Sequence, residues 1–190
     1  PGGCVHGLSF LDAGDGWVTP AEGQPYMRRH TEGDAWDWES YTAPASYGMN
    51  GVSMVTEDFG FAVGNGGRIF EFDGDEWVDV DSPTDESLHN ISMLSDVKGW
   101  AVGDGGTILS WDGTAWEEMD SGSSKDLHGI QALGSDSVWV VGEDGKLLFF
   151  GGDEWVGLES PTEAPLKGIF MFDAGSGWVV GHEGTVLQLG

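Results

Sequence analysis

Basic residues are scarce in this chain of 190 residues. Seven lysines and arginines stand against 33 aspartates and glutamates, and the formal net charge is −26. Such a surface repels the phosphates of nucleic acids and the head groups of anionic lipids. We therefore expect neither nucleic acid nor a membrane surface as a partner. A cationic partner, a high-salt setting or plain solubility all agree with the charge.

Cysteine and long apolar runs are also lacking. Cys4 is the one cysteine, so no disulfide can form within the chain. No apolar run approaches the roughly 18 residues of a membrane-spanning helix, which predicts no membrane insertion. The chain begins at Pro1, as expected of a mature or trimmed piece, and Gly-Gly-Cys4 could be the end of a lipoprotein cleavage site. The sequence thus favours an exported protein, extracellular or at the cell surface, with a lipid anchor at Cys4 as one interpretation.

Glycine and tryptophan, in contrast, are abundant, with 33 and 10 residues. The glycines fall at fixed places rather than in a low-complexity tract, which is typical of turns. The tryptophans are suited to anchor the faces of β-sheets. Hydrophobic residues make up 39% of the chain, enough for a folded domain with a sizeable core.

The strongest signal is an internal repeat of 39 residues. Three separate registers share this period. One is an aromatic residue before a small apolar pair, at Phe61, Trp100, Trp139 and Trp178. The second is an apolar first strand, at Leu88-His-Asn-Ile91, Leu127-His-Gly-Ile130 and Leu166-Lys-Gly-Ile169. The third is a later tryptophan, at Trp77, Trp116 and Trp155. Agreement among three registers makes coincidence very improbable.

Each repeat predicts four short strands with polar, turn-rich links, and no helix longer than a turn. The units run at about 5–44, 49–83, 88–122, 127–161 and 166–190. The first is degenerate, and we expect it to lose its hairpin between Pro20 and His30. The last stops after its third strand. Four strands per period of about 40 residues predict an all-β fold, a β-propeller of four-stranded antiparallel blades, as a single domain over residues 1–190. About five blades fit, as a five-bladed ring with an incomplete last blade or as part of a larger, for example seven-bladed, ring.

At these residues the chain resembles the propeller repeats of the photosystem II assembly and stability factor family. The matching pieces are Gly99-Trp-Ala-Val-Gly103, Gly105-Gly-Thr-Ile-Leu109 and Trp111-Asp-Gly113 followed by Trp116. Similarity to the Asp-box repeats of sialidase type is also visible. The resemblance implies a propeller with an assembly or binding role. Those assembly factors hold their partner through a basic patch, which this acidic chain does not offer, so their specific role does not transfer.

Two groups of residues are candidates for a site. One would form a ring at the central channel, because its members share one position of the first strand: His6, Asn50, His89, His128 and Lys167. The alternative is that these polar residues only hydrate the channel mouth, and a lysine in the ring argues against a metal. The other group breaks the repeat pattern and could contact a ligand or partner: Arg28, Arg29, His30, Trp36, Trp38 and Trp111.

Aspartates beside the turn glycines are expected to fix the turns through backbone hydrogen bonds rather than to bind calcium, at Asp73, Asp112 and Asp153. No catalytic triad, nucleotide loop or metal-ligand spacing stands out, and we expect no enzyme, metal or cofactor. The function predicted is a non-catalytic scaffold that binds a protein partner. A carbohydrate-binding propeller that binds a glycan is the alternative, and a glycoside hydrolase is the third reading.

Overall fold

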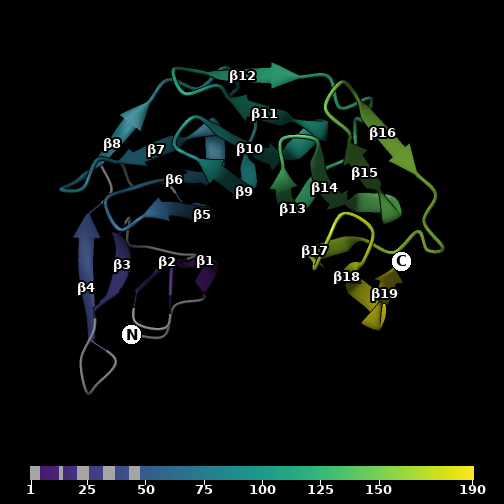
Figure 1. The fold of residues 1–190 in the computed structure, drawn as a ribbon, viewed down its shortest axis with the longest axis horizontal. Helices are drawn as coiled ribbons and strands as arrows, with labels where there is room; N and C mark the ends of the chain where they lie inside the picture. Colours follow the sequence, from purple (N-terminus) through teal and green to yellow (C-terminus); the bar gives the residue numbers. More distant parts are fainter. Residues whose placement is uncertain (1–4, 13–14, 21–25, 32–36, 43–47) are drawn as a thin grey trace.

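The computed structural model describes residues 5–12, 15–20, 26–31, 37–42 and 48–190. For the described residues from 20 to 42 it gives the backbone only, except that the side chain of Tyr41 is also described. Five antiparallel sheets follow one another along the chain and form an open arc (Figure 1). The fold is a β-propeller of about five blades, as the repeat predicts. Among the described residues, no strand pairing joins the first sheet to the last.

Each blade is an antiparallel meander, in which the first strand lies at the inside of the arc and each later strand lies further toward the rim (Figure 1). Blade 1 holds β1 (Val5–Phe10), β2 (Gly16–Pro20), β3 (Tyr26–Thr31) and β4 (Asp37–Thr42). Blade 2 holds β5 (Met49–Thr56), β6 (Phe59–Gly64), β7 (Ile69–Phe72) and β8 (Trp77–Val80). Blade 3 holds β9 (Leu88–Ser95), β10 (Lys98–Gly103), β11 (Ile108–Trp111) and β12 (Trp116–Met119).

Blade 4 holds β13 (Leu127–Gly134), β14 (Ser137–Gly142), β15 (Leu147–Phe150) and β16 (Trp155–Leu158). Blade 5 has three strands, β17 (Leu166–Met171), β18 (Gly177–Gly181) and β19 (Val186–Leu189). The missing fourth strand of this blade is as predicted. The expected loss of the hairpin in the first unit is wrong, because β2 and β3 pair antiparallel with Trp17 opposite Arg29.

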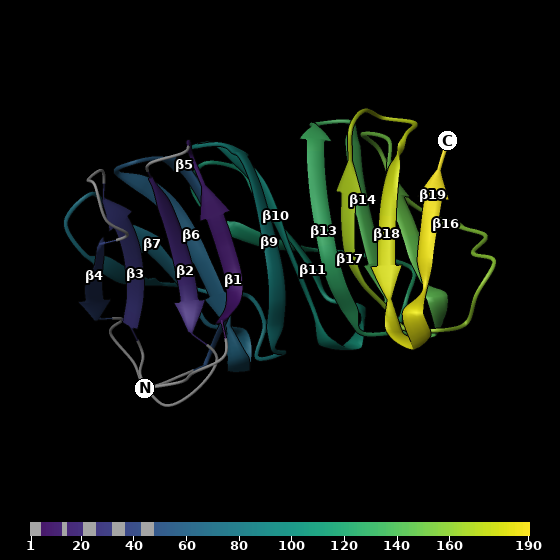
Figure 2. The same ribbon diagram turned by 90° about the horizontal axis from the view of Figure 1, so that it is seen from below.

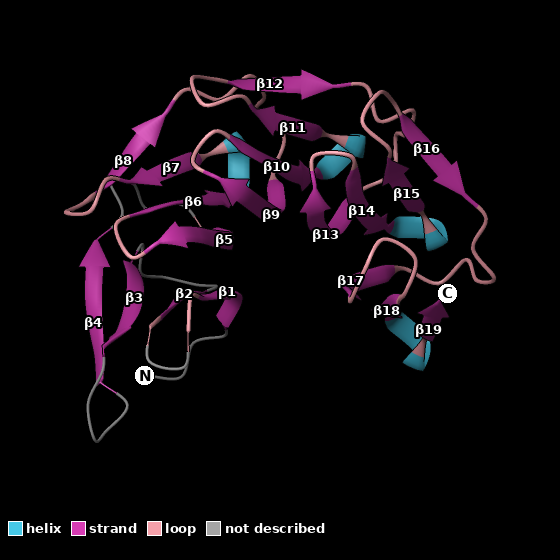
Figure 3. Ribbon diagram, in the orientation of Figure 1, coloured by secondary structure: helices cyan, strands magenta, loops and turns pink. Residues whose placement is uncertain are grey.

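Helical structure in the described residues is limited to single 3-10 turns between the second and third strands of blades 2 to 5 (Figure 3). They are η1 (Asn65–Gly67), η2 (Asp104–Gly106), η3 (Glu143–Gly145) and η4 (His182–Gly184). No described helix has the length and apolarity needed to cross a membrane. Each turn places one polar side chain at the same end of its blade.

Glycine is required at the end of these turns. Gly106 has φ +83°, and a Cβ there would overlap the carbonyl oxygen of Ser123 in the link to the next blade. Glycine is needed for a second reason between the inner strands. A Cβ on Gly51 of β5 would lie 3.0 Å from the Cα of Asn90 on β9. The small residue therefore allows neighbouring inner strands to approach closely.

The core consists of four clusters, one between each two successive blades, so blades 2, 3 and 4 are buried on both faces. We call the face toward the preceding blade the leading face and the face toward the following blade the trailing face. On the trailing face of blade 3, Trp100, Val102 and Ile108 pack against Val140 and Leu148 on the leading face of blade 4. Neighbouring blades thus bury one another's apolar faces, which is the main source of stability in this fold.

A hydrogen bond accompanies the apolar packing at every interface between blades. A polar side chain on the inner strand of one blade accepts a hydrogen bond from a backbone N–H on the inner strand of the next. The four bonds run from Met54 N to Ser9 Oγ at 3.0 Å, Met93 N to Ser53 Oγ at 3.1 Å, Ala132 N to Ser92 Oγ at 3.0 Å and Met171 N to Gln131 Oε1 at 2.5 Å. The acceptor position is thus part of the repeat.

Candidate functional site

A row of polar side chains follows the inner strands at the end of the blades where the 3-10 turns lie. Each of three pairs joins a residue on an inner strand to a residue 15 positions later that begins the 3-10 turn of the same blade. Asn50 Nδ2 donates to Asn65 Oδ1 at 3.0 Å, His89 Nε2 lies 2.6 Å from Asp104 Oδ1, and His128 Nε2 lies 2.7 Å from Glu143 Oε1. We call these six residues and Lys167 the polar row.

The polar row is also linked from blade to blade. Lys167 on β17 reaches back to blade 4, where its Nζ donates to Glu143 Oε1 at 2.8 Å and lies 2.7 Å from His128 Nε2. Asn50 Nδ2 donates to the Leu88 carbonyl of blade 3 at 2.8 Å. The rings of His89 and His128 lie 5.2 Å apart between centroids. The row is therefore a connected network rather than a set of separate side chains.

The environment of His128 favours the neutral imidazole. Burial lowers its pKa, and this effect exceeds the opposing effect of the hydrogen bond to Glu143. The charge of Lys167 lowers the pKa further. The hydrogen bond from Lys167, followed by that from His128, lowers the pKa of Glu143. Since a single nitrogen faces both neighbours, Nε2 of His128 either donates to Glu143 or accepts from Lys167, and its tautomer selects between the two.

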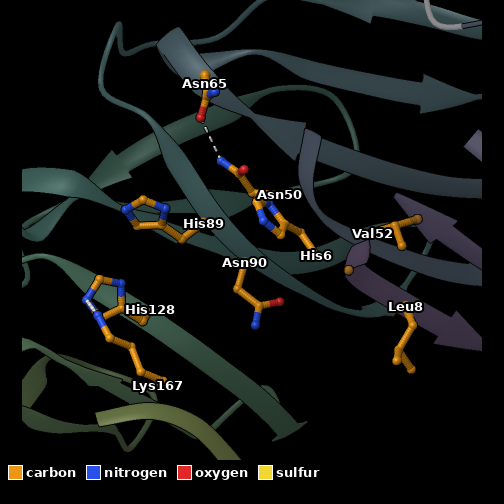
Figure 4. A pocket seen from close by; sticks show the side chains of 10 residues that line it. His6, Leu8, Asn50, Val52, Asn65, His89, Asn90, His128 and Lys167 are labelled. Carbon is orange, nitrogen blue, oxygen red and sulfur yellow. Dashed lines mark hydrogen bonds between the residues drawn. The ribbon is translucent and has the colours of Figure 1, made fainter. Parts of the chain in front are cut away.

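The polar row borders a cavity of about 730 Å³ at the inner side of the arc. Figure 4 shows five members of the row, Asn50, Asn65, His89, His128 and Lys167, on one side of this cavity and Leu8 and Val52 on another. Asn90 of β9 also lines it, and its Oδ1 accepts a hydrogen bond from the Ile91 N–H. The cavity therefore combines hydrogen-bonding groups with a short apolar wall.

The structure brings the predicted channel residues together. All five line this one cavity, from the inner strands of the five blades: His6, Asn50, His89, His128 and Lys167. Most of the second predicted group cannot be compared with this cavity, because it falls outside what the structure describes. Trp36 and Cys4 lie outside the described residues, and so do the side chains of four more: Arg28, Arg29, His30 and Trp38.

The structure does not support Trp111 as a platform for a ligand. Its side chain is 6% exposed and packs among Phe61 and Trp116, and its Nε1 donates to the Asp96 carbonyl at 2.8 Å. Trp111 does not break the repeat either, because one period earlier and later the same position holds Phe72 and Phe150. It is an aromatic residue of the core.

The turn aspartates form the hydrogen bonds expected of them in two blades. Asp112 Oδ1 accepts from the N–H groups of Thr114 and Ala115, and Asp73 Oδ1 accepts from those of Asp75 and Glu76. These hydrogen bonds lower the pKa of both carboxyl groups. In blade 4 the equivalent position is occupied by Gly151 rather than by Asp153. Among the described residues, no three His, Cys, Asp or Glu side chains have an arrangement that could hold a metal ion.

The pairing within the polar row was missed by the sequence analysis. The channel residues were predicted without their partners in the 3-10 turns, although a constant separation of 15 positions links them. That separation was the available signal. The link from Lys167 to Glu143 has no such signal, because it joins different blades over 24 positions.

The fold and the cavity define a β-propeller with a polar site at its inner side. No protein-family model matches the chain, and no curated protein is significantly similar to it. Among solved structures, the chain is similar to YCF48 bound to a D1 peptide, with 18% sequence identity and a TM-score of 0.71. The match covers 97% of this chain and 63% of that one, so the chain spans less than two thirds of the length of that YCF48.

A second similar structure is YCF48 from Cyanidioschyzon merolae, with 17% identity, a TM-score of 0.47 and coverage of 96% of this chain and 78% of that one. At this identity a likeness shows the fold alone. The similarity to YCF48 at a TM-score of 0.71 confirms, at the level of the fold, the resemblance to propellers of the photosystem II assembly factors.

Proposed function

We propose that this propeller is a non-catalytic scaffold that binds a segment of a protein partner in the cavity beside the polar row. The lining of the cavity carries this proposal. Asn50, Asn90 and His89 offer side-chain donors and acceptors that suit a peptide backbone, and Leu8 and Val52 offer contacts for an apolar side chain. Such a mixture of apolar wall and few polar groups is typical of binding sites.

Two further observations support a protein ligand. The similar YCF48 structure was solved with a D1 peptide bound. The net charge of −26 favours a partner with basic residues, because complementary charges accelerate encounter and suppress wrong partners. The ammonium group of Lys167 has three protons, and the two directed at Glu143 and His128 leave the third for a ligand carbonyl.

The chemistry of the lining supports a non-catalytic role. The described lining includes no serine, threonine, cysteine, aspartate or glutamate, and the two acids of the row are engaged by His89, His128 and Lys167. Binding of a glycan remains a prediction from the sequence. An extracellular or cell-surface location likewise remains a proposal, supported by the acidic composition.

Selection from a display library of unstructured 12-residue peptides tests this function. We expect the selected peptides to be enriched in lysine and arginine, and their affinity to fall at least tenfold for the variant Asn50→Ala/Lys167→Ala. Lys125→Ala is the matched control, since Lys125 is an exposed lysine that pairs with Asp144 away from the cavity lining. Failure to enrich any peptide, or equal binding to the parent chain and the cavity variant, would contradict the proposal.

A further inference from the structure

A groove of about 900 Å³ lies between blades 2 and 3, at the end of the blades opposite to the polar row. Its walls come from the links β5–β6 and β9–β10 and from the turn between β11 and β12. In a meander these links lie at one end, and the 3-10 turns between second and third strands lie at the other. Figure 2 shows the blades side-on, with the link between β17 and β18 at one end and the link between β18 and β19 at the other. We call this site the hairpin groove.

The lining of the hairpin groove is largely apolar. Blade 2 contributes Val55 and Phe59, and blade 3 contributes Leu94 and Val97. Val97 is 55% exposed, which is unusual for a valine in a tight turn between strands. Hydroxyl groups border the apolar part, from Thr56, Ser95 and Thr114. The groove therefore offers apolar contacts together with a few hydrogen-bonding groups.

Glu71 is a partly buried acid of the hairpin groove, and the chain provides no partner for it. It lies on β7 opposite Phe61 of β6, so its side chain is on the trailing face of blade 2, toward blade 3. Burial raises the pKa of Glu71, and the charge of Asp73 raises it further. Among the described residues, no hydrogen bond or ion pair engages its carboxylate, and the described lining holds no lysine, arginine or histidine. A negative charge thus stands beside an apolar wall without a compensating cation.

Three residues of this lining depart from the repeat of blades 2 to 5. The position of Phe59 is polar in the other three blades, that of Val97 is aspartate or glycine, and that of Glu71 is not acidic. The equivalent residues are Lys98, Ser137 and Ser176 for Phe59, Asp58, Asp136 and Gly175 for Val97, and Ser110, Phe149 and Gln188 for Glu71. The framework of the blade does not require these three residues, yet they meet in one groove from two blades. Such local departures from a pattern are typical of functional sites.

The next blade carries a cation at the equivalent place. Lys98 stands one period after Phe59, and its Nζ lies 4.9 Å from the centroid of the Trp100 ring, an attractive contact. In blade 2 the corresponding pair is Phe59 and Phe61, whose rings meet edge to face at 5.4 Å between centroids. Blade 3 thus supplies its own cation beside its aromatic residue. Blade 2 has an aromatic residue and an acid there instead, and lacks the cation.

We propose that the hairpin groove binds a basic side chain, lysine or arginine, of a segment of a protein partner. The charged group pairs with the carboxylate of Glu71, and its aliphatic stem lies along Phe59 and Val97. The groove is larger than one side chain, so residues on either side of the basic one also fit, with the border hydroxyls available to their backbone. This site lies at the other end of the blades from the polar row and does not rest on binding there.

NMR titration of the isotope-labelled whole chain with an acetylated and amidated pentapeptide tests the proposal. The peptide has a central arginine between leucines and alanines, and its twin carries citrulline, which is uncharged and similar in shape. We expect saturable shifts of the amide signals of residues 55–59, 94–97 and 113–114, and at least fivefold weaker binding of the citrulline peptide. Glu71→Gln should weaken binding of the arginine peptide at least fivefold. Glu154→Gln is the matched control, because it removes the same charge from an exposed turn of blade 4 outside the lining.

Each other outcome overturns the proposal. Without shifts in the hairpin groove, or with equal binding of the two peptides, the groove does not recognise a basic side chain. Equal weakening by Glu71→Gln and Glu154→Gln would show attraction by net charge alone. Agmatine, which carries the guanidinium group without a peptide, should bind at least fivefold more weakly, and equal binding would assign the groove to small amines.

The variants and the two sites can be told apart in the same spectra. Glutamine has nearly the shape of glutamate, so Glu71→Gln should fold, and its dispersed amide signals check this. The cavity variant Asn50→Ala/Lys167→Ala should show the parent's shifts in the hairpin groove. Failure of this site is therefore distinguishable from failure of the proposed function.

Discussion

His128 Nε2 lies 2.7 Å from Glu143 Oε1, and this contact closes the inner strand of blade 4 onto its 3-10 turn. The same closure links His89 to Asp104 and Asn50 to Asn65 in the two preceding blades. The repeat thus places a polar pair at the same position in blades 2, 3 and 4, although the residues of the pair differ from blade to blade. The polar row follows from this arrangement, and the first two predictions concern it.

Acid should weaken the fold through His128. Burial lowers its pKa in the folded chain below the value of about 6.5 expected in the unfolded chain, so below that pH the unfolded state binds more protons. Its contribution to stability is therefore complete above pH 6.5 and is lost as the pH falls through the folded pKa. We expect the urea midpoint to fall more between pH 7.5 and 5.5 in the parent chain than in His128→Asn, which carries the amide found at Asn50. Identical decreases would contradict this reading of the site.

Lys167 should control the protonation of both of its neighbours. In Lys167→Met the pKa of Glu143 should rise, because the hydrogen bond from Lys167 is the main cause of its low value, and the pKa of His128 should also rise, because a nearby positive charge is lost. Titration followed by NMR of the His128 ring and the Glu143 carboxyl group measures both. Lys98→Met serves as the control, because Lys98 lies over the ring of Trp100 in blade 3, and it should leave both groups unchanged.

Truncation of equivalent aromatic residues should have unequal effects. Trp100→Ala removes a fully buried side chain between blades 3 and 4 and should lower the free energy of unfolding by about 3–5 kcal/mol. Trp178→Ala, at the same position of the repeat, removes a side chain that is 41% exposed and should cost about 1 kcal/mol or less. Urea unfolding at 1 µM compares them. Similar losses in both variants would contradict the view that burial against a neighbouring blade sets the cost.

The hydrogen bonds between blades should contribute measurably to stability. Ser92→Ala leaves the Ala132 N–H without its acceptor between blades 3 and 4 and should cost about 1–3 kcal/mol. Ser95→Ala is a matched control, because the Ser95 hydroxyl accepts only an exposed turn hydrogen bond from Val97 and should cost clearly less. Thermal unfolding followed by tryptophan fluorescence ranks the two. A control that loses as much as Ser92→Ala would contradict a special role for the interface bond.

The repeat made most of the fold predictable from the chain. Registers such as Trp77, Trp116 and Trp155 recur every 39 residues, and the period itself implies blades that bury their faces on one another. The channel position was predictable for the same reason, since equivalent residues such as His89 and His128 must lie at equivalent places on neighbouring inner strands. Glycine at the turns marked where strands end.

Other features could not be read from the pattern. The burial of Trp111 depends on the ring of Phe61 in the neighbouring blade, and the bond from Lys167 to Glu143 depends on the distance between two inner strands. Neither is encoded in a local periodicity. The hairpin of the first unit also forms against expectation, because backbone pairing of β2 with β3 does not require the apolar alternation of the other blades.

The sequence by itself determined the blade, because short strands, turn glycines and alternating apolar residues act within about 40 residues. Only the tertiary structure decided which faces are covered. Trp100 and Trp178 occupy the same position in the repeat, yet the first is buried and the second is exposed. Burial depends on what packs against a residue: blade 4 covers Trp100, and among the described residues no strand covers Trp178.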